Sequence, residues 1–282
     1  MGISKLNKVK VGKETIKEQY TVLDRKTILD AKVGIDALIV LIQCLTNGPI
    51  LKSRGGKITL HINTLVNKLL KYPYKQLWVF DNQDKNDLKL KTVMKRKFKS
   101  EIFTHIKLSD AVKDFKKILD MVGIKYVTSP PKVEAECYLV ELKRIGIIDY
   151  ILTTDTDVLA YGEDMLVFEK EFKLYKIDSI LNNLNLKISE FRKMCVMLGT
   201  DFNDKIAGVT FNTILNNLDL PLSNSDMIAT YIMFSLRVAL VHDKEELEPL
   251  KPVFTNDLVK FLIDLDFKNL VEKILNRSTL DI

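Results

Sequence analysis

The stretch "ILTTDTDVLAYG" (residues 151–162) places two acidic side chains directly after an aliphatic run. Residues 150–152 have the apolar character of a buried strand, and Asp155 and Asp157 follow one residue apart. Two like charges at the end of a buried strand repel each other unless positive charge lies beside them. The stretch therefore predicts a buried strand with a cation-binding site at its carboxyl end.

Short β-type runs alternate with helical patterns along the rest of the chain. Strands are predicted at 32–36, 76–81 and 149–155, with a short strand and turn at 124–131. Helices are predicted at 37–45, 58–70, 87–101, 133–146 and 108–123, the last capped by Ser109 and closed by Gly123. Strands separated by helices of this length predict an α/β fold, a mostly parallel sheet flanked by helices.

Three of the predicted strands end in an aspartate: Asp36, Asp81 and Asp155. Ligands of open α/β sheets bind just outside the carboxyl ends of the strands, so parallel neighbours would bring these carboxylates together. The alternative is that each aspartate caps the helix that follows it. Three such residues, together with Asp157, favour a shared site.

Three more acids extend this pattern. Glu134 and Glu136 stand where a helix begins after a proline turn, and Asp201 follows Gly199 at the end of a later helix. Each has an ordinary alternative, because acids in a first helical turn complement the helix dipole or act as caps. Around one pocket, however, seven carboxylates would raise one another's pKa, and bound cations would relieve that repulsion.

The donor set indicates which cation would bind. Oxygen ligands without histidine or cysteine favour Mg²⁺ or Mn²⁺. Two such ions about 4 Å apart clamp the attacking and leaving oxygens of a phosphodiester during hydrolysis. The three cysteines are scattered and are expected to be reduced core thiols, and a structural zinc site is not expected.

Composition and short motifs exclude several other classes of protein. The 282 residues carry a net charge of +6, which weakly favours an anionic partner. The N-terminus lacks the apolar core of a signal peptide, and the most apolar stretch, residues 33–45, contains Asp36 and is too short to span a bilayer. "SRGGK" (53–57) lacks the glycine and the hydroxyl residue of a phosphate-binding loop. An intracellular protein with no membrane partner is expected.

The sequence resembles the flap endonuclease/XPG family of structure-specific 5′ nucleases along essentially its whole length. The resemblance rests on "MGISKL", "VGIDA", "VFDN", "VEAECYL", "TTDTDVLAYG" and "MLGTDFNDKIAGV". Matched motif by motif, it implies that the metal-site acids are Asp36, Asp81, Glu134, Glu136, Asp155, Asp157 and Asp201. The first four would serve one Mg²⁺ and the last three a second, with some contacts through water and with Mn²⁺ as a substitute.

The resemblance also implies a PIN-like 5′-nuclease fold in two parts. Residues 1–200 would form the nuclease domain, with a basic helical arch at about 83–122. Residues 201–282 would form a helix–hairpin–helix and C-terminal helices that pack on that domain. Two amphipathic segments in the last third of the chain are expected to be helices that pack on the domain, with no catalytic or binding role.

A basic segment follows Asp81. Residues 88–99 carry six Lys or Arg side chains and no acid, and Lys89 and Arg96 lie two helical turns apart on one face. Their spacing is similar to that of the lysine and arginine with which the family contacts the scissile phosphate, so both are expected to be catalytic. A solvated basic face is the alternative. The further residues expected to contact DNA are Gly2, Lys52, Arg54, Lys57, Lys91, Lys95, Gly199, Asp201 and Gly208.

Three departures from the family pattern stand out. Ile42 replaces a tyrosine that stacks on a substrate base, and an aliphatic side chain is a poorer stacking platform. Thr210 replaces the second glycine of the hairpin, where a β-branched residue restricts close approach of the backbone. The ending "LNRSTLDI" lacks the tail that recruits a sliding clamp, so clamp binding is not expected.

The sequence thus predicts a Mg²⁺-dependent structure-specific 5′ endonuclease that acts on branched or flapped DNA in replication, repair or recombination. A monomer is expected, and the nucleus (the host nucleus for a viral protein) is favoured over the cytoplasm. A 5′-3′ exonuclease or RNase of the same fold is an alternative. An inactive nucleic-acid-binding scaffold is another, and so is an unrelated Mg²⁺ phosphohydrolase, although "IDA" lacks the second aspartate of the aspartyl-phosphate type.

Overall fold

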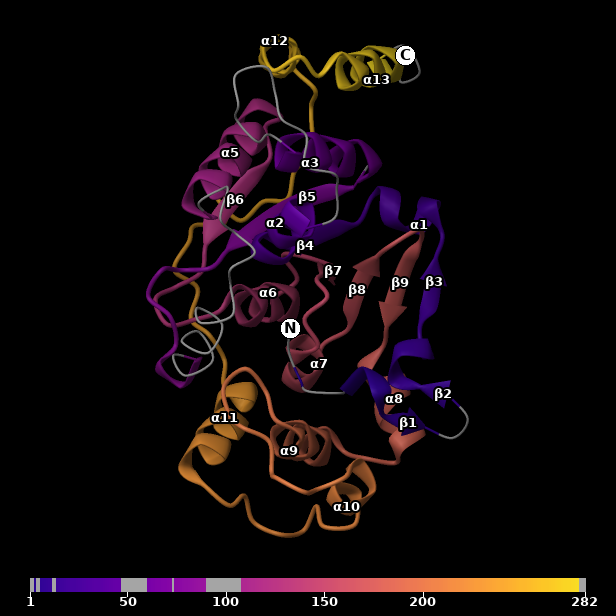
Figure 1. Ribbon diagram of the computed structural model, residues 1–282, viewed down its shortest axis with the longest axis vertical. Coiled ribbons are helices and arrows are strands. Elements are labelled where there is room, and N and C mark those ends of the chain that lie inside the picture. The colour runs from indigo at the N-terminus through magenta and orange to yellow at the C-terminus, as the bar shows by residue number, and fades with distance from the viewer. Residues whose placement is uncertain are drawn as a thin grey trace.

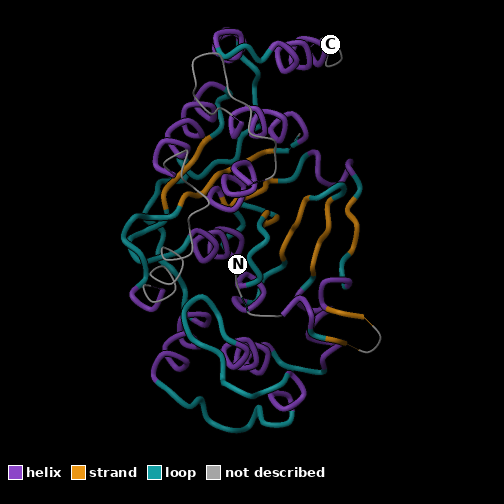
Figure 2. The backbone as a smooth tube through the Cα atoms, in the orientation of Figure 1, coloured by secondary structure: helices purple, strands orange, loops and turns teal. Residues whose placement is uncertain are grey.

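A twisted seven-stranded sheet runs through the middle of the molecule, and helices cover both of its faces (Figures 1 and 2). The structure is a computed structural model that describes residues 3, 6–11, 14–46, 60–72, 74–89 and 108–278. The strand order is β3-β9-β8-β7-β4-β5-β6. The strands are β3 (Thr21–Leu23), β4 (Lys32–Asp36), β5 (Lys75–Phe80), β6 (Lys125–Thr128), β7 (Tyr150–Leu152), β8 (Met165–Phe168) and β9 (Phe172–Tyr175).

The direction of the strands decides where the site lies. β8, β7, β4, β5 and β6 pair in parallel, whereas β9 and β3 are antiparallel to their neighbours. β7, β4 and β5 are therefore adjacent, and their carboxyl ends meet at one edge of the sheet, as the sequence predicted. A separate small sheet pairs β1 (Lys10–Val11) with β2 (Glu14–Thr15) near the N-terminus.

The central strands are buried on both faces, which explains their continuous apolar runs. In β5, Leu77 and Val79 pack into one hydrophobic core, and Trp78 and Phe80 pack into the core on the opposite face. In β4, Gly34 packs closely against α6, and a Cβ atom there would come within 2.5 Å of the side chain of Leu139 in α6 and 2.4 Å of that of Ile148 after it. The two cores fix the register of the strands and hence the positions of the residues at their ends.

Each core is covered by its own set of helices. One face carries α2 (Ala37–Thr46), α3 (Leu60–Lys71) and α5 (Leu108–Met121), together with α1 (Arg25–Leu29). The other carries α6 (Ala135–Arg144), α7 (Asp157–Tyr161), α8 (Ile177–Leu184) and α9 (Ile188–Leu198). The short 3₁₀ turns are η1 (Leu6–Lys8), η2 (Ile16–Glu18) and η3 (Asp87–Lys89).

The C-terminal third divides between the two ends of the molecule. α10 (Phe211–Leu215) and α11 (Ser225–Ser235) pack beside α9. α12 (Asn256–Asp264) and α13 (Lys268–Ser278) pack at the opposite end against α5 and α3 (Figure 1). The connecting segment forms an antiparallel bridge with β5, where Gln76 and Leu250 exchange backbone hydrogen bonds of 2.7 and 3.0 Å. Among the helices the structure describes, none has the length and apolar character needed to cross a bilayer.

The elements expected from the sequence agree with the structure to within three residues where they are described. The predicted strand 149–155 stops at Leu152, because Thr153 begins the turn that carries the aspartates. The cap assigned to Ser109 is wrong, since α5 begins at Leu108 and already includes it. Of the basic helix expected at 87–101, only the 3₁₀ turn η3 lies within the described residues.

We expect Gly199→Ala to destabilise the protein more than Gly208→Ala. Both glycines have positive φ angles, +88° and +72°, where an alanine costs roughly 1–2 kcal/mol. A Cβ atom at Gly199 would also come within 2.7 Å of the Lys205 backbone nitrogen, whereas Gly208 has open space. Urea denaturation should show an additional loss on the order of 1–3 kcal/mol for Gly199→Ala. Equal losses for the two variants would contradict this account.

Candidate active site

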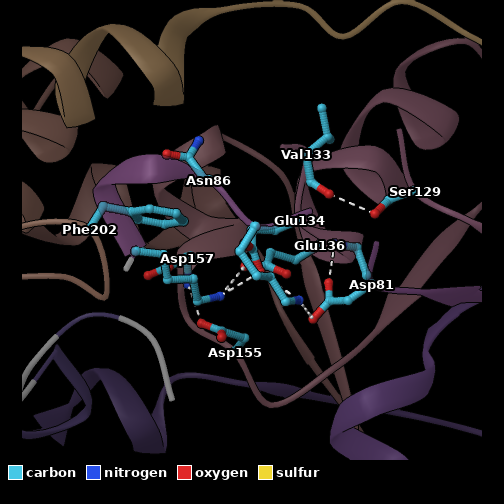
Figure 3. Close-up of polar contacts among 12 residues, drawn as sticks. Asp81, Asn86, Ser129, Val133, Glu134, Glu136, Asp155, Asp157 and Phe202 are labelled. Atoms are coloured by element: carbon cyan, nitrogen blue, oxygen red, sulfur yellow. Dashed lines mark hydrogen bonds and ion pairs between the residues drawn. The ribbon is translucent and has the colours of Figure 1, made fainter. Parts of the chain in front are cut away.

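The predicted acids gather at the carboxyl edge of β7, β4 and β5. All seven lie within the described residues, and all but Asp81, which is half-buried, are buried. Figure 3 shows five of them pointing toward one another in the space between the strand ends and the start of α6. The structure therefore brings together side chains that are up to 165 positions apart in the sequence, from Asp36 to Asp201.

Asp36 ends β4 and is held from two sides. Its Oδ1 accepts a hydrogen bond of 3.2 Å from the Ile39 backbone N–H, so it also caps α2. Its Oδ2 accepts a hydrogen bond of 3.1 Å from the hydroxyl of Thr153, which follows β7. Burial, with the nearby charges of Asp81 and Asp155, raises the pKa of Asp36 to about 7. Asp36 thus caps α2 and also lies beside other acids of the site.

Hydrogen bonds between the segments that follow β5 and β6 position the two glutamates. The Asn82 backbone N–H donates to the Ser129 hydroxyl at 3.1 Å, and that hydroxyl donates to the Val133 carbonyl at 2.6 Å (Figure 3). The Ala135 backbone N–H then donates to Asp81 Oδ1 at 2.8 Å. These bonds draw the first turn of α6 against the end of β5.

The entry of the chain into α6 aims both glutamates at one site. Glu134 is the N-cap residue, with extended backbone angles of −76° and 154°, and Glu136 already lies within the helix. Because the backbone changes direction between them, side chains two positions apart can face the same place. Glu136 is 4% exposed, and burial raises its pKa well above the usual range for a glutamate.

The turn after β7 carries the remaining pair. The Asp155 N–H donates to the Thr153 hydroxyl at 3.0 Å, and the Asp157 N–H donates to Asp155 Oδ1 at 3.1 Å. Asp157 is fully buried, and its two carboxylate oxygens accept no hydrogen bond within the part of the chain that the structure describes. Burial and the charge of Asp155 raise its pKa well above the usual range.

The carboxylates form two overlapping groups that fit divalent cations. Oxygen atoms of Asp81, Glu134 and Glu136 all lie within 4.8 Å of one another, and so do those of Glu136, Asp155 and Asp157. Glu136 belongs to both groups. Such an all-oxygen donor set fits Mg²⁺ or Mn²⁺. Three of its oxygens, Oε1 of Glu136 and both of Asp157, are buried and have no hydrogen-bond partner among the described residues.

Asp36 and Asp201 flank these two groups. The charges of Asp81 and Asp155 act on Asp36, and the charge of Asp201 acts on both Asp155 and Asp157. Asp155 is thus a neighbour of both residues, and the division of the seven acids between two ions stays a prediction.

Two lysines place positive charge beside the carboxylates and so reduce the repulsion among them. Lys89 Nζ lies 2.6 Å from Glu134 Oε2, 3.9 Å from Glu136 Oε1 and 5.4 Å from the centre of the Phe202 ring. Burial alone would lower the pKa of Lys89, but Glu136 and Glu134 outweigh it and raise that pKa. Lys85 Nζ lies 2.7 Å from Asp81 Oδ2.

Sequence reasoning placed Lys89 in the site but missed other members. Lys85 and Thr153 contact the acids directly, and the Ile3 backbone N–H donates to the Thr156 hydroxyl at 2.9 Å, which ties the N-terminal segment to the turn between Asp155 and Asp157. A signal was present for Lys85, which stands four residues after Asp81. Thr153 has a weaker one, its position directly after the apolar run of β7.

A loop joins α9 to α10 where the sequence predicted a hairpin. Gly199 ends α9 with a positive φ, Gly208 adopts a positive φ in the loop, and α10 follows. Thr210 has an ordinary φ of −92° and caps α10, since its hydroxyl accepts a hydrogen bond of 3.2 Å from the Thr213 N–H. The hydroxyl residue thus serves as a helix cap at this position.

Several residues expected to contact DNA lie outside the described part of the chain. They are Gly2, Lys52, Arg54, Lys57, Lys91, Lys95 and Arg96. Their roles stay predictions.

Comparisons with known proteins identify relatives of part of this chain. Residues 123–201, which carry five of the acids, match the XPG I-region family. The probable RAD2-like endonuclease 369L of Invertebrate iridescent virus 6 is 35% identical over 109 residues, covering 33% of this chain and 26% of that protein. The chain spans only about a quarter of the length of the first relatives it matches.

Two solved structures share the fold over nearly the whole chain. Flap endonuclease-1 from Methanococcus jannaschii has a TM-score of 0.71 at 19% identity, over 93% of this chain and 97% of that one. The catalytic core of Rad2 in complex with DNA substrate has a TM-score of 0.73 at 19% identity, over 94% of this chain and 95% of that one. At this identity the likeness shows the fold.

We expect the metal-free protein to lose stability as the pH rises from 5 to 8. The pKa of Asp36 is about 7 in the folded protein, against an ordinary value of 3.8, so the folded state binds the proton more tightly. That contribution is present below pH 4 and is lost as the pH approaches 7. Denaturation in EDTA should show a decrease on the order of 2 kcal/mol over this range. A free energy of unfolding that rises over the same range would contradict this.

We also expect Asp157→Asn to raise the melting temperature of the metal-free protein. Asparagine has the same shape and removes a buried charge whose two oxygens lack partners among the described residues. Thermal denaturation in EDTA should show a gain of several degrees, on the order of 1–2 kcal/mol. Asp178→Asn, the same change at an exposed position in α8, is the control and should have little effect. A lower melting temperature for Asp157→Asn would contradict this prediction and would show that other groups stabilise the charge of the Asp157 carboxylate.

Proposed function

This chain belongs to the flap endonuclease/XPG family, and we propose that it is a divalent-metal-dependent 5′ nuclease that cleaves branched or flapped DNA. The observation that carries the proposal is the pair of overlapping carboxylate groups that share Glu136. A protein that only bound nucleic acid would have no need to bury this much like charge. The sharing of one ligand brings the two cation positions close together, as phosphodiester hydrolysis requires.

Each group of residues has a distinct role in the proposed reaction. Asp81, Glu134 and Glu136 would hold one Mg²⁺, and Glu136, Asp155 and Asp157 would hold the other, with Asp36 and Asp201 completing the two coordination spheres. When bound, the ions would supply the positive charge that activates the attacking water and stabilises the leaving oxygen.

The ammonium group of Lys89 has a separate task. It lies against Glu134 and Phe202 at the border of the carboxylate groups. There it can donate a charge-assisted hydrogen bond to an oxygen of the scissile phosphate and hold the phosphate in line with the site.

Several features support DNA as the substrate. The Rad2 core, which shares the fold, is described as bound to a DNA substrate. The chain is basic overall, and in the hairpin between α9 and α10 the exposed Gly208 has a positive φ and open space beside it, which allows its backbone to approach a phosphate closely. Gly199, by contrast, is buried against Lys205. We propose a monomer that acts in replication, repair or recombination within the nucleus.

The direct test is a cleavage assay in Mg²⁺ with matched 5′-flap, nicked, single-stranded DNA and RNA substrates. We expect cleavage near the flap junction and a loss of about 100-fold or more in Asp155→Asn, since several kcal/mol of charge stabilisation would be removed. Asp178→Asn should cleave like the wild type.

Two results would contradict the proposal in different ways. Preferential cleavage of RNA, or of free 5′ ends without regard to the junction, would replace the flap substrate with the exonuclease or RNase alternative. Tight DNA binding with no cleavage of any substrate in Mg²⁺ or Mn²⁺ would identify a scaffold.

A further inference from the structure

Lys85 occupies the side of Asp81 that faces the cation site. Asp81 Oδ1 already accepts a hydrogen bond from the Ala135 backbone N–H at 2.8 Å, and Lys85 Nζ lies 2.7 Å from Asp81 Oδ2. The same ammonium lies 3.8 Å from Glu134 Oε2. Both oxygens of Asp81 are thus engaged by groups of the protein itself.

Lysine ion pairs are unevenly divided between the two carboxylate groups. The group of Asp81, Glu134 and Glu136 has two lysine ammonium groups within 4.0 Å of its oxygens, from Lys85 and Lys89. In the group of Glu136, Asp155 and Asp157, the one ion pair within the described residues is the 3.9 Å contact of Lys89 with Glu136. Asp157 there has two buried oxygens without a hydrogen-bond donor in the described chain.

The two lysines also differ in how easily they can leave. The Lys89 side chain is 11% exposed and lies against Phe202, whereas the Lys85 side chain is 27% exposed on the loop between β5 and η3. A lysine has a flexible stem, and an ion pair that reaches solvent contributes little free energy. Lys85 can therefore move into water at small cost.

We propose that Lys85 is a built-in counter-cation, which stabilises the Asp81–Glu134 pair without metal and which a divalent cation must displace in order to bind there. The inference rests on the proposed function only in requiring that these carboxylates bind divalent cations. Because the ammonium competes for Asp81 Oδ2, it weakens cation binding at Asp81 and Glu134. Lys85 thus sets the cation concentration at which this position fills.

The test measures cation binding and stability without relying on cleavage. Metal-free wild type, Lys85→Met and Lys85→Arg are titrated calorimetrically with Ca²⁺ and with Mg²⁺, and are melted in EDTA. Lys132→Met is the matched control, because Lys132 makes a 3.0 Å ion pair with Asp87 on an exposed surface nearby.

Lys85→Met should bind the cation at Asp81 and Glu134 about threefold to tenfold more tightly than the wild type. This is the gain in affinity expected when a competing, partly exposed ion pair is removed. It should also melt at a lower temperature than the wild type in EDTA, and saturating Ca²⁺ should raise its melting temperature by more than it raises that of the wild type. Lys85→Arg keeps the charge and should resemble the wild type, as should Lys132→Met.

The outcomes separate this inference from the proposed function. If the wild type binds cations and cleaves DNA but Lys85→Met binds them equally or more weakly, the role of Lys85 is overturned and the nuclease proposal stands. If neither wild type nor Lys85→Met binds Ca²⁺, Mg²⁺ or Mn²⁺, both are overturned. Equal tightening in Lys132→Met would reduce the effect to overall charge and would also overturn the specific role of Lys85.

Discussion

Repulsion among buried carboxylates is the constraint on which the rest of this structure depends. Three neighbouring parallel strands have an acid at or just after their ends at one edge of the sheet, and the starts of α6 and α7 add three more within a few ångströms. Folding must therefore hold like charges together where water is excluded, which raises the pKa of Asp36, Glu136 and Asp157. Such a site is arranged to bind cations, and it lowers the stability of the folded protein when no cation is bound.

The fold offsets this repulsion with local contacts of its own. Backbone N–H groups of Ile39, Ala135 and Asp157 donate to three of the carboxylates, and Lys85 and Lys89 place ammonium groups against Asp81 and Glu134. The two hydrophobic cores on opposite faces of the sheet keep the strand ends in register beneath the site. Both carboxylate oxygens of Asp157 are buried and have no hydrogen-bond donor among the described residues. Cation binding should therefore have its largest electrostatic effect on Asp157.

Much of this arrangement could be predicted from the sequence because buried parallel strands read as apolar runs and their carboxyl ends meet. That reasoning located Asp36, Asp81 and Asp155 at one edge. It could not identify the contacts of Lys85 or Thr153, which depend on loop conformations that bring distant segments together. β8 and β9, two four-residue strands, carried no motif and were not assigned. The amphipathic pattern of α12 showed an apolar side but not that α5 would cover it.

The most direct test of the account is the anomalous scattering of Mn²⁺ in crystals of the protein. The geometry predicts two peaks about 4 Å apart, one among Asp81, Glu134 and Glu136 and the other among Glu136, Asp155 and Asp157. Peaks at both positions would establish that the buried carboxylates exist to hold a pair of cations. Density with no peak at these oxygens, at Mn²⁺ concentrations that saturate known two-metal nucleases, would contradict the central claim.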